Sequence, residues 1–215
     1  MDDTRRIGVF INCPFDNQYK KCQFAIILTV VACGLQPRSS LETATVSTPR
    51  MKRISDAIRD SEYSIHDLTR VHSDEKSGLP RFNMPFEFGM AFLLTESPEY
   101  SHDWLGLLPG AHTLDLPPGA HAFGEFISDL AGYDLPSHDE TPDTIIPPVL
   151  AWLSTRQGCP PVPRAVTSLA LCELMDEFLR LLDREETRWK DQLPWSQIVK
   201  VAQDMIASKP WRTDA

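Results

Sequence analysis

Residues 6–34 read RIGVFINCPFDNQYKKCQFAIILTVVACG, and this segment sets the fold class. Its first part, Arg6–Cys13, is short, rich in β-branched and aromatic residues, and followed by Pro14, which predicts a buried strand. Apolar residues then recur at helical spacing as far as Cys33, and Gly34 suits the position just after a helix end. Because the opposite face is also apolar, we expect this helix to lie between a sheet and another layer.

The rest of the first 157 residues alternates between strand and helix patterns. In order, they predict a strand at 35–40, a helix at 50–60, a strand at 62–68, an exposed loop at 71–80, a helix starting near Pro85, strands at 104–108 and 113–116, and helices at 123–132 and 143–155. The five prolines and glycines between 109 and 119 leave a loop there as the alternative. Alternating strands and helices predict an α/β fold with a mostly parallel sheet.

A linker, GCPPVPR at 158–164, separates this part from a helical tail. Amphipathic patterns at 166–181 and 195–206 predict two helices in the tail. We therefore expect an α/β domain at 1–157 and a C-terminal helical extension at 158–215. The apolar faces of the extension would pack on the core or on a second copy.

Composition disfavours several classes of protein. The net charge is −9 and no basic stripe is present, so nucleic acid is not an expected partner. The longest apolar stretch, Phe24–Cys33, is too short to span a bilayer, and a cytoplasmic protein without membrane contact is expected. The five cysteines form no CxxC pair, and the histidines are irregularly spaced, so no metal site is predicted. Neither GxxxxGK[ST], GxGxxG nor GxSxG occurs, which disfavours P-loop NTPases, Rossmann dehydrogenases and α/β-hydrolases.

In a doubly wound sheet, ligands bind beyond the carboxyl ends of the strands. Three segments should meet there. They are Asn12, Cys13, Pro14 and Phe15 after the first strand, His66 and Asp67 at the end of the third, and Arg81, Asn83, Phe86 and Glu87 at the start of the next helix.

Glu87 is the strongest candidate for chemistry. Pro85 fits the first helical position with Met84 as its cap, which puts Glu87 third in the helix. The positive end of the helix dipole should keep its carboxylate ionised, as a nucleophile toward a sugar C1′ requires. The alternative is an ordinary acidic residue that caps its own helix.

The other candidates also have structural alternatives. Asp67 could bind ribose hydroxyls or orient Glu87, or it could act as a cap or pair with Arg70. His66 could be a structural histidine. Arg53 and Arg81 could hold a phosphate or form surface ion pairs, and Asn12 could bind a base or sugar or only shape a strand-end turn.

The segments VFINCPFD, YSIHDLTR, LPRFNMPFEFGMAF and FISDLAGYD, in order across residues 6–155, resemble a bacterial family similar to nucleoside 2-deoxyribosyltransferases and TIR domains. Members resemble modules of bacterial antiviral defence systems. The resemblance implies a flavodoxin-like three-layer sandwich with a glutamate, here Glu87, that attacks an N-glycosidic bond. It also implies that Asp67 contacts the sugar and that residues 12–15 line the pocket.

Deoxyribosyltransferases carry an acid about six positions before the nucleophile, whereas this chain has Arg81. Without that acid a neutral base leaves poorly, but the nicotinamide of NAD is a cationic pyridinium that departs neutral. The expected function is therefore a hydrolase acting on NAD or a related nucleotide as substrate, with no cofactor. The alternatives are a nucleotide-binding sensor without turnover, and deoxynucleoside base exchange with Asp74 or Glu75 as the acid. A homo-oligomer, or a defence-system partner on the C-terminal helices, is expected.

Overall fold

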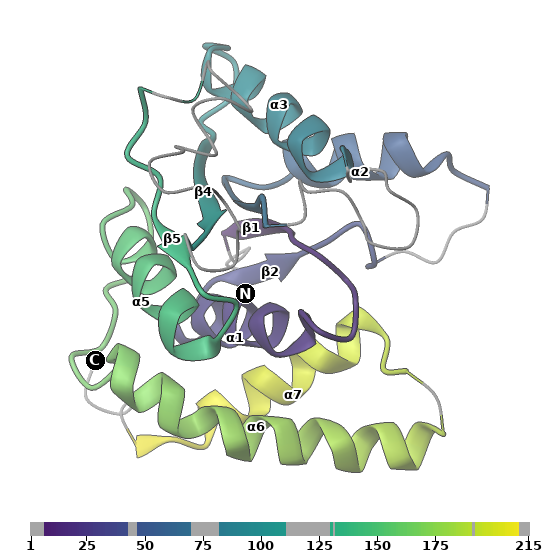
Figure 1. Ribbon diagram of the computed structural model, residues 1–215, viewed down its shortest axis with the longest axis vertical. Helices are drawn as coiled ribbons and strands as arrows, with labels where there is room; N and C mark the ends of the chain where they lie inside the picture. The colour runs from purple at the N-terminus through teal and green to yellow at the C-terminus, as the bar shows by residue number, and fades with distance from the viewer. Residues whose placement is uncertain are drawn as a thin grey trace, which may run out of the picture.

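The computed structural model describes residues 7–42, 47–69, 82–110, 130, 132–190 and 192–210. Five parallel strands form one sheet in the order β2-β1-β3-β4-β5. The strands are β1 (Gly8–Asn12), β2 (Gln36–Arg38), β3 (Tyr63–Asp67), β4 (Asp103–Pro109) and β5 (Ser137–His138). The helices are α1 (Lys20–Ala32), α2 (Arg50–Arg59), α3 (Asn83–Thr95), α5 (Pro142–Leu153), α6 (Ser168–Trp189) and α7 (Trp195–Ala207) (Figure 1). This strand order is that of flavodoxin-like folds, and it confirms the predicted fold class.

Alternation along β1 assigns its side chains to the two faces of the sheet. Val9 and Ile11 belong to the large core cluster formed with α1, α5, α6 and α7. Phe10 points the other way and packs against Ile54 and Ile58 of α2. All five residues of β1 are buried, as expected for a central strand of a parallel sheet that is covered on both faces.

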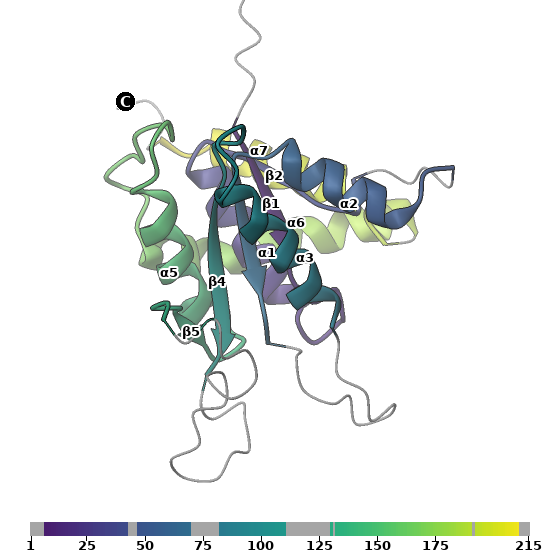
Figure 2. The same ribbon diagram turned by 90° about the horizontal axis from the view of Figure 1, so that it is seen from above.

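The molecule has four layers, because the two faces of the sheet are covered to different depths (Figures 1 and 2). Helices α2 and α3 form the outer layer on one face. On the other face, α1 and α5 pack against the sheet, and α6 and α7 cover them in turn. Eleven of the thirteen residues of α1 are buried, so the prediction that this helix lies between the sheet and another layer is confirmed.

The C-terminal helices pack on the α/β part of the chain. Phe178 of α6 is fully buried, and its ring centroid lies 6.0 Å from that of Phe24 in α1. The hydroxyl of Thr167, the N-cap of α6, accepts a hydrogen bond from the backbone N–H of Ala170 at 3.2 Å. Within the described ranges, no helix combines the length and apolarity that a bilayer crossing requires.

The predicted start of α3 is wrong by two residues. Phe82 is the N-cap and Asn83 the first helical residue, so Pro85 stands third and Glu87 fifth. Proline is tolerated anywhere in the first turn, because the N–H groups there have no intrahelical partner, and its position therefore does not mark the helix start. Strand β5 was not predicted. The predictions for 71–80 and 113–116 lie outside the described residues, as does the helix predicted at 123–132 except for residues 130 and 132, which are not in an α-helix.

Candidate functional site

The carboxyl ends of β1 and β3 are joined to the start of α3 by the amide of Asn12. Its Nδ2 atom donates to the backbone oxygen of Met84 and to Nδ1 of His66, both at 3.0 Å. Asn12 is 3% exposed, so both amide hydrogens are used inside the protein. The three predicted segments therefore meet, as expected, at one edge of the sheet.

His66 has a structural environment. Nδ1 accepts from Asn12, which places the ring proton on Nε2, and the ring packs against Phe88 with centroids 5.1 Å apart. The side chain is completely buried, and burial, helped by nearby His102, lowers the pKa of His66 to about 3. A neutral imidazole without solvent contact favours the structural interpretation of this residue.

Cys13 follows β1 directly and is also buried. Burial, followed by the charges of Asp67 and other acidic neighbours including Glu87, raises the pKa of the Cys13 thiol well above its ordinary value. The thiol therefore stays protonated at neutral pH and is not an activated nucleophile.

Asp67 is the centre of a buried polar network. Its Oδ2 accepts hydrogen bonds from the Tyr19 hydroxyl and from Nε2 of His138, the latter at 2.7 Å. Its Oδ1 accepts from the backbone N–H of Thr69 at 2.9 Å. The side chains of Asp67 and His138 are fully buried. The contacts of Asp67 thus join the ends of β3 and β5 to the segment before α1.

The hydrogen bonds of His138 assign its ring proton. The backbone N–H of Glu140 donates to Nδ1 at 3.1 Å, so the proton is on Nε2, facing Asp67. Both ring nitrogens of His138 and both carboxylate oxygens of Asp67 are then engaged. This network can fix the positions of three strand-end segments, but it presents no titratable atom to a ligand.

Glu87 has a different environment at the same edge. The residue is 5% exposed, and the nearest described cation is Nη2 of Arg50, the first residue of α2, 3.7 Å from Oε1. Burial raises the pKa of Glu87 to about 7, and the Arg50 charge lowers it only in part. The expected ionisation of Glu87 by the helix terminus is therefore weakened: Glu87 lies a turn inside the helix, and burial moves its pKa from 4.5 to about 7.

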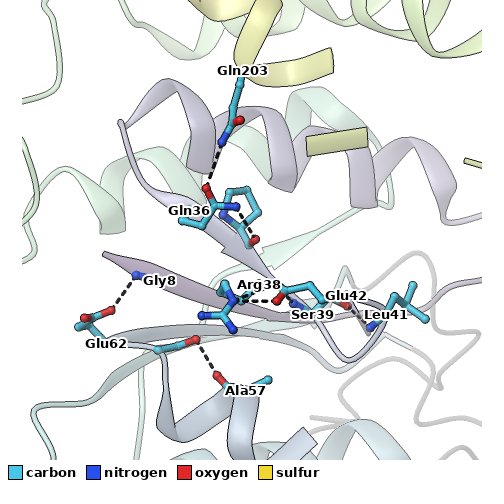
Figure 3. A network of polar contacts seen from close by, with 11 residues as sticks. Gly8, Gln36, Arg38, Ser39, Leu41, Glu42, Ala57, Glu62 and Gln203 are labelled. Atoms are coloured by element: carbon cyan, nitrogen blue, oxygen red, sulfur yellow. Dashed lines mark hydrogen bonds and ion pairs between the residues drawn. The ribbon is translucent and has the colours of Figure 1, made fainter. Parts of the chain in front are cut away.

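Arg53, one turn after Arg50 on α2, lines a cavity of about 240 Å³ beside the end of β2, and Glu87 is not among the residues that line this cavity. The same cavity is lined by Arg38 and Glu42, and Nε of Arg38 donates to both carboxylate oxygens of Glu42 at 2.9 Å (Figure 3). Arg38 is thus neutralised by its own neighbour, and Asp56 and Asp60 add further negative charge to the lining.

The remaining predicted residues lie around the rim or outside the described chain. Pro14 is buried, whereas Phe15, Asn83 and Phe86 are exposed. Arg81, Asp74 and Glu75 are outside the described residues.

The sequence reasoning missed three residues of this region, namely Tyr19, Arg50 and His138. Arg50 had a usable signal, because it opens the helix that follows β2. His138 had none, because two polar residues do not resemble a strand.

No group of three histidine, cysteine or acidic residues that could hold a metal ion occurs in the part of the chain that the structure describes. No protein-family model matches the chain, and no curated protein matches it either.

Proposed function

We propose that the chain cleaves an N-glycosidic bond of NAD or a related nucleotide, with Glu87 as the reacting carboxyl group. The observation that carries this proposal is the buried environment of Glu87 and the raised pKa that results from it. Glu87 is a buried carboxyl at the ligand-binding edge of a parallel sheet, compensated by one arginine at 3.7 Å, and its pKa is raised to about 7. Carboxyl groups with such shifts are concentrated at catalytic sites.

The proposed reaction needs one carboxylate. The bond between C1′ of the ribose and the pyridinium nitrogen breaks, and its electron pair stays on the departing neutral nicotinamide. Ionised Glu87 stabilises the positive charge that develops at C1′, as in retaining glycosidases. A water oxygen then bonds to C1′, and its proton passes to Glu87 or to solvent. A pKa near 7 suits a group that must be charged in one step and take up a proton in the next.

Arg50 and Asn12 have supporting roles in this scheme. The Arg50 guanidinium favours the charged form of Glu87. The Asn12 amide holds the first turn of α3, and with it the backbone that carries Glu87, against the end of β1. The proposed contact between Asp67 and the ribose receives no support, because Asp67 is fully buried and all its described contacts are internal.

The test measures nicotinamide release from NAD by the purified full chain. We expect Glu87→Gln to reduce release by about a hundredfold to a thousandfold, the scale of losing a charge-stabilising catalytic group. Glu96→Gln is the matched control, because Glu96 is exposed at the other end of α3. Equal rates for Glu87→Gln and the unaltered protein would remove Glu87 from the mechanism.

A second candidate, a nucleotide-binding sensor without turnover, is favoured by the saturated network around Asp67. That network leaves Glu87 without a second described acid or base. Calorimetry with NAD, deoxynucleosides and cyclic nucleotides, run beside the product assay, separates the two functions. Binding without product supports the sensor.

A further inference from the structure

Helix α3 is apolar on its outward side as well as on its inward side. Phe82 at the N-cap, Phe86 and Leu93 are 63%, 60% and 69% exposed. The one charged residue among the thirteen of α3 is Glu87, and it is buried. Helix α1 is similarly apolar, but α6 and α7 cover it, whereas α3 lies in the outermost layer on its side of the sheet (Figures 1 and 2).

The exposed positions lie on one face of the helix. Phe82, Phe86, Gly89 and Leu93, which we call the α3 stripe, follow one another at intervals of four, three and four residues. Such intervals place side chains above one another along the helix axis.

Gly89 in the middle of the stripe has no described role within its own chain. A Cβ atom added there would meet nothing within 4 Å among the described residues, and its φ is not among the positive values found at Gly34 and Gly158. Glycine inside a helix weakens the helix relative to alanine. Because glycine has no side chain, Gly89 leaves a notch between the exposed side chains of Phe86 and Leu93. Such a notch can receive a side chain of a molecule that packs against the helix.

We propose that the α3 stripe is the centre of a symmetric interface with a second copy of this chain, packed antiparallel. The intervals four, three, four read the same in both directions. A two-fold axis between Phe86 and Gly89 therefore places the Phe86 ring over Gly89 of the second copy, and Phe82 against Leu93 of the second copy. A two-fold interface must be self-complementary in this way, whereas a stripe that binds an unrelated partner need not be.

The charge of the chain and the apolar area of the stripe both favour a second copy as the partner. Two copies of a chain with net charge −9 repel each other through most surfaces, but the stripe carries no charged side chain. The two exposed phenylalanines leave roughly 200–300 Å² of ring surface in water, if each ring side chain has about 150–250 Å² to bury. A stable interface buries about 800 Å² per partner, so the stripe supplies the apolar centre of the interface and the surface around it supplies the remaining area. This inference does not depend on the proposed reaction.

Sedimentation equilibrium of the full chain over a range of concentrations tests the interface. We expect a dimer that Leu93→Lys weakens by at least roughly tenfold in Kd, the effect of losing one anchor side chain. Leu169→Lys is the matched control: Leu169 is 70% exposed, against 69% for Leu93, but lies on α6 on the opposite side of the molecule. A monomer at all concentrations, or equal weakening by both changes, overturns the proposal.

Gly89→Leu distinguishes a specific interface from nonspecific association through exposed apolar side chains. The leucine has open space in its own chain, so the fold should be retained, as circular dichroism would show. It adds apolar area but fills the notch that receives Phe86. We expect at least roughly tenfold weaker dimerisation. Unchanged or stronger association would mean that the helices do not meet at Gly89, and would overturn the proposed packing.

Discussion

Glu87 and Asp67 are buried carboxyl groups at the same edge of the sheet, but their surroundings differ. Asp67 accepts hydrogen bonds from Tyr19, Thr69 and His138, and these donors replace the water it has lost. Glu87 has the Arg50 guanidinium at 3.7 Å, and Arg50 is half exposed, so solvent weakens its attraction. The sequence made Glu87 the strongest candidate and Asp67 a second candidate at the same edge. The number of hydrogen-bond donors around each carboxylate, which depends on β5 and α2, distinguishes the fully hydrogen-bonded Asp67 from Glu87, whose charge is only partly compensated.

The pH dependence of stability follows from the raised pKa of Glu87. Its pKa is about 7 in the folded state and 4.5 as the ordinary value, so between these pH values the folded state binds more protons than the unfolded state. Stability therefore falls as pH rises from about 4.5 to about 7, and the penalty is complete above 7. Glu87→Gln removes this penalty, so we expect its stability advantage over the unaltered protein to grow across that window, by at most about 3 kcal/mol.

Urea denaturation at several pH values measures this difference. Other groups that titrate, such as His66, contribute equally to both proteins and cancel. Glu96→Gln, at an exposed position, should show a small difference that does not change with pH. A constant difference for Glu87→Gln would mean that Glu87 titrates normally in the folded protein.

At the scale of single elements, Gly34 and Gly89 have opposite roles. Gly34 follows α1 with φ of +79°, and its N–H donates to the Val31 oxygen while that of Leu35 donates to the Val30 oxygen. This paired arrangement, the Schellman motif, requires a left-handed residue. Gly89 lies inside α3 with open space around it, so nothing in its own helix requires a glycine.

Alanine at the two positions should therefore change stability in opposite directions. Gly34→Ala forces a side chain into the left-handed region and should cost about 1–2 kcal/mol. Gly89→Ala removes a flexible residue from a helix interior and should stabilise the monomer by up to about 1 kcal/mol. Urea denaturation at concentrations low enough to keep the chain monomeric measures both. Changes of the same sign would contradict these roles.

The elements that the sequence predicted well are those with a strong periodic pattern. The buried run before Pro14 gave β1, and the long apolar repeat ending at Gly34 gave α1. The start of α3 was misplaced because Pro85 is compatible with several positions in a first turn. Strand β5 has two residues, and its pairing with Leu108 and Pro109 comes from the sheet rather than from local preference. The candidate site was predicted only in part. The sequence indicated which strand ends and which helix start meet, but it did not indicate Tyr19, Arg50 and His138, which reach this region through contacts between distant segments.

The main hydrophobic core contains residues from both sides of the linker at 158–164. One cluster of buried side chains includes residues from β1, α1 and α5 and from both C-terminal helices. Phe178 of α6 is fully buried and packs edge-on against Phe24, while Lys20 of α1 pairs with Glu186 of α6 at 2.6 Å. Helices α6 and α7 cover α1, which is apolar on the side facing them as well as on the side facing the sheet, so the α/β part would expose a large apolar surface without them.

Phe178→Ala tests whether the two parts fold as one unit. Removing a fully buried phenylalanine side chain should cost about 3–5 kcal/mol, whereas Leu169→Ala, at an exposed position of the same helix, should change stability by less than about 0.5 kcal/mol. If the core is continuous, the helix signal by circular dichroism and the fluorescence of the tryptophans should lose amplitude in one shared transition at lower urea. The tryptophans report on both parts of the chain, because Trp104 and Trp152 precede the linker and Trp189, Trp195 and Trp211 follow it. Two transitions, with only the first shifted by Phe178→Ala, would mean that the helical tail unfolds separately. A shared transition would mean that α1 depends for its burial on helices encoded after the linker, so that the sheet edge at which Asn12, Asp67 and Glu87 lie is stabilised by the whole chain.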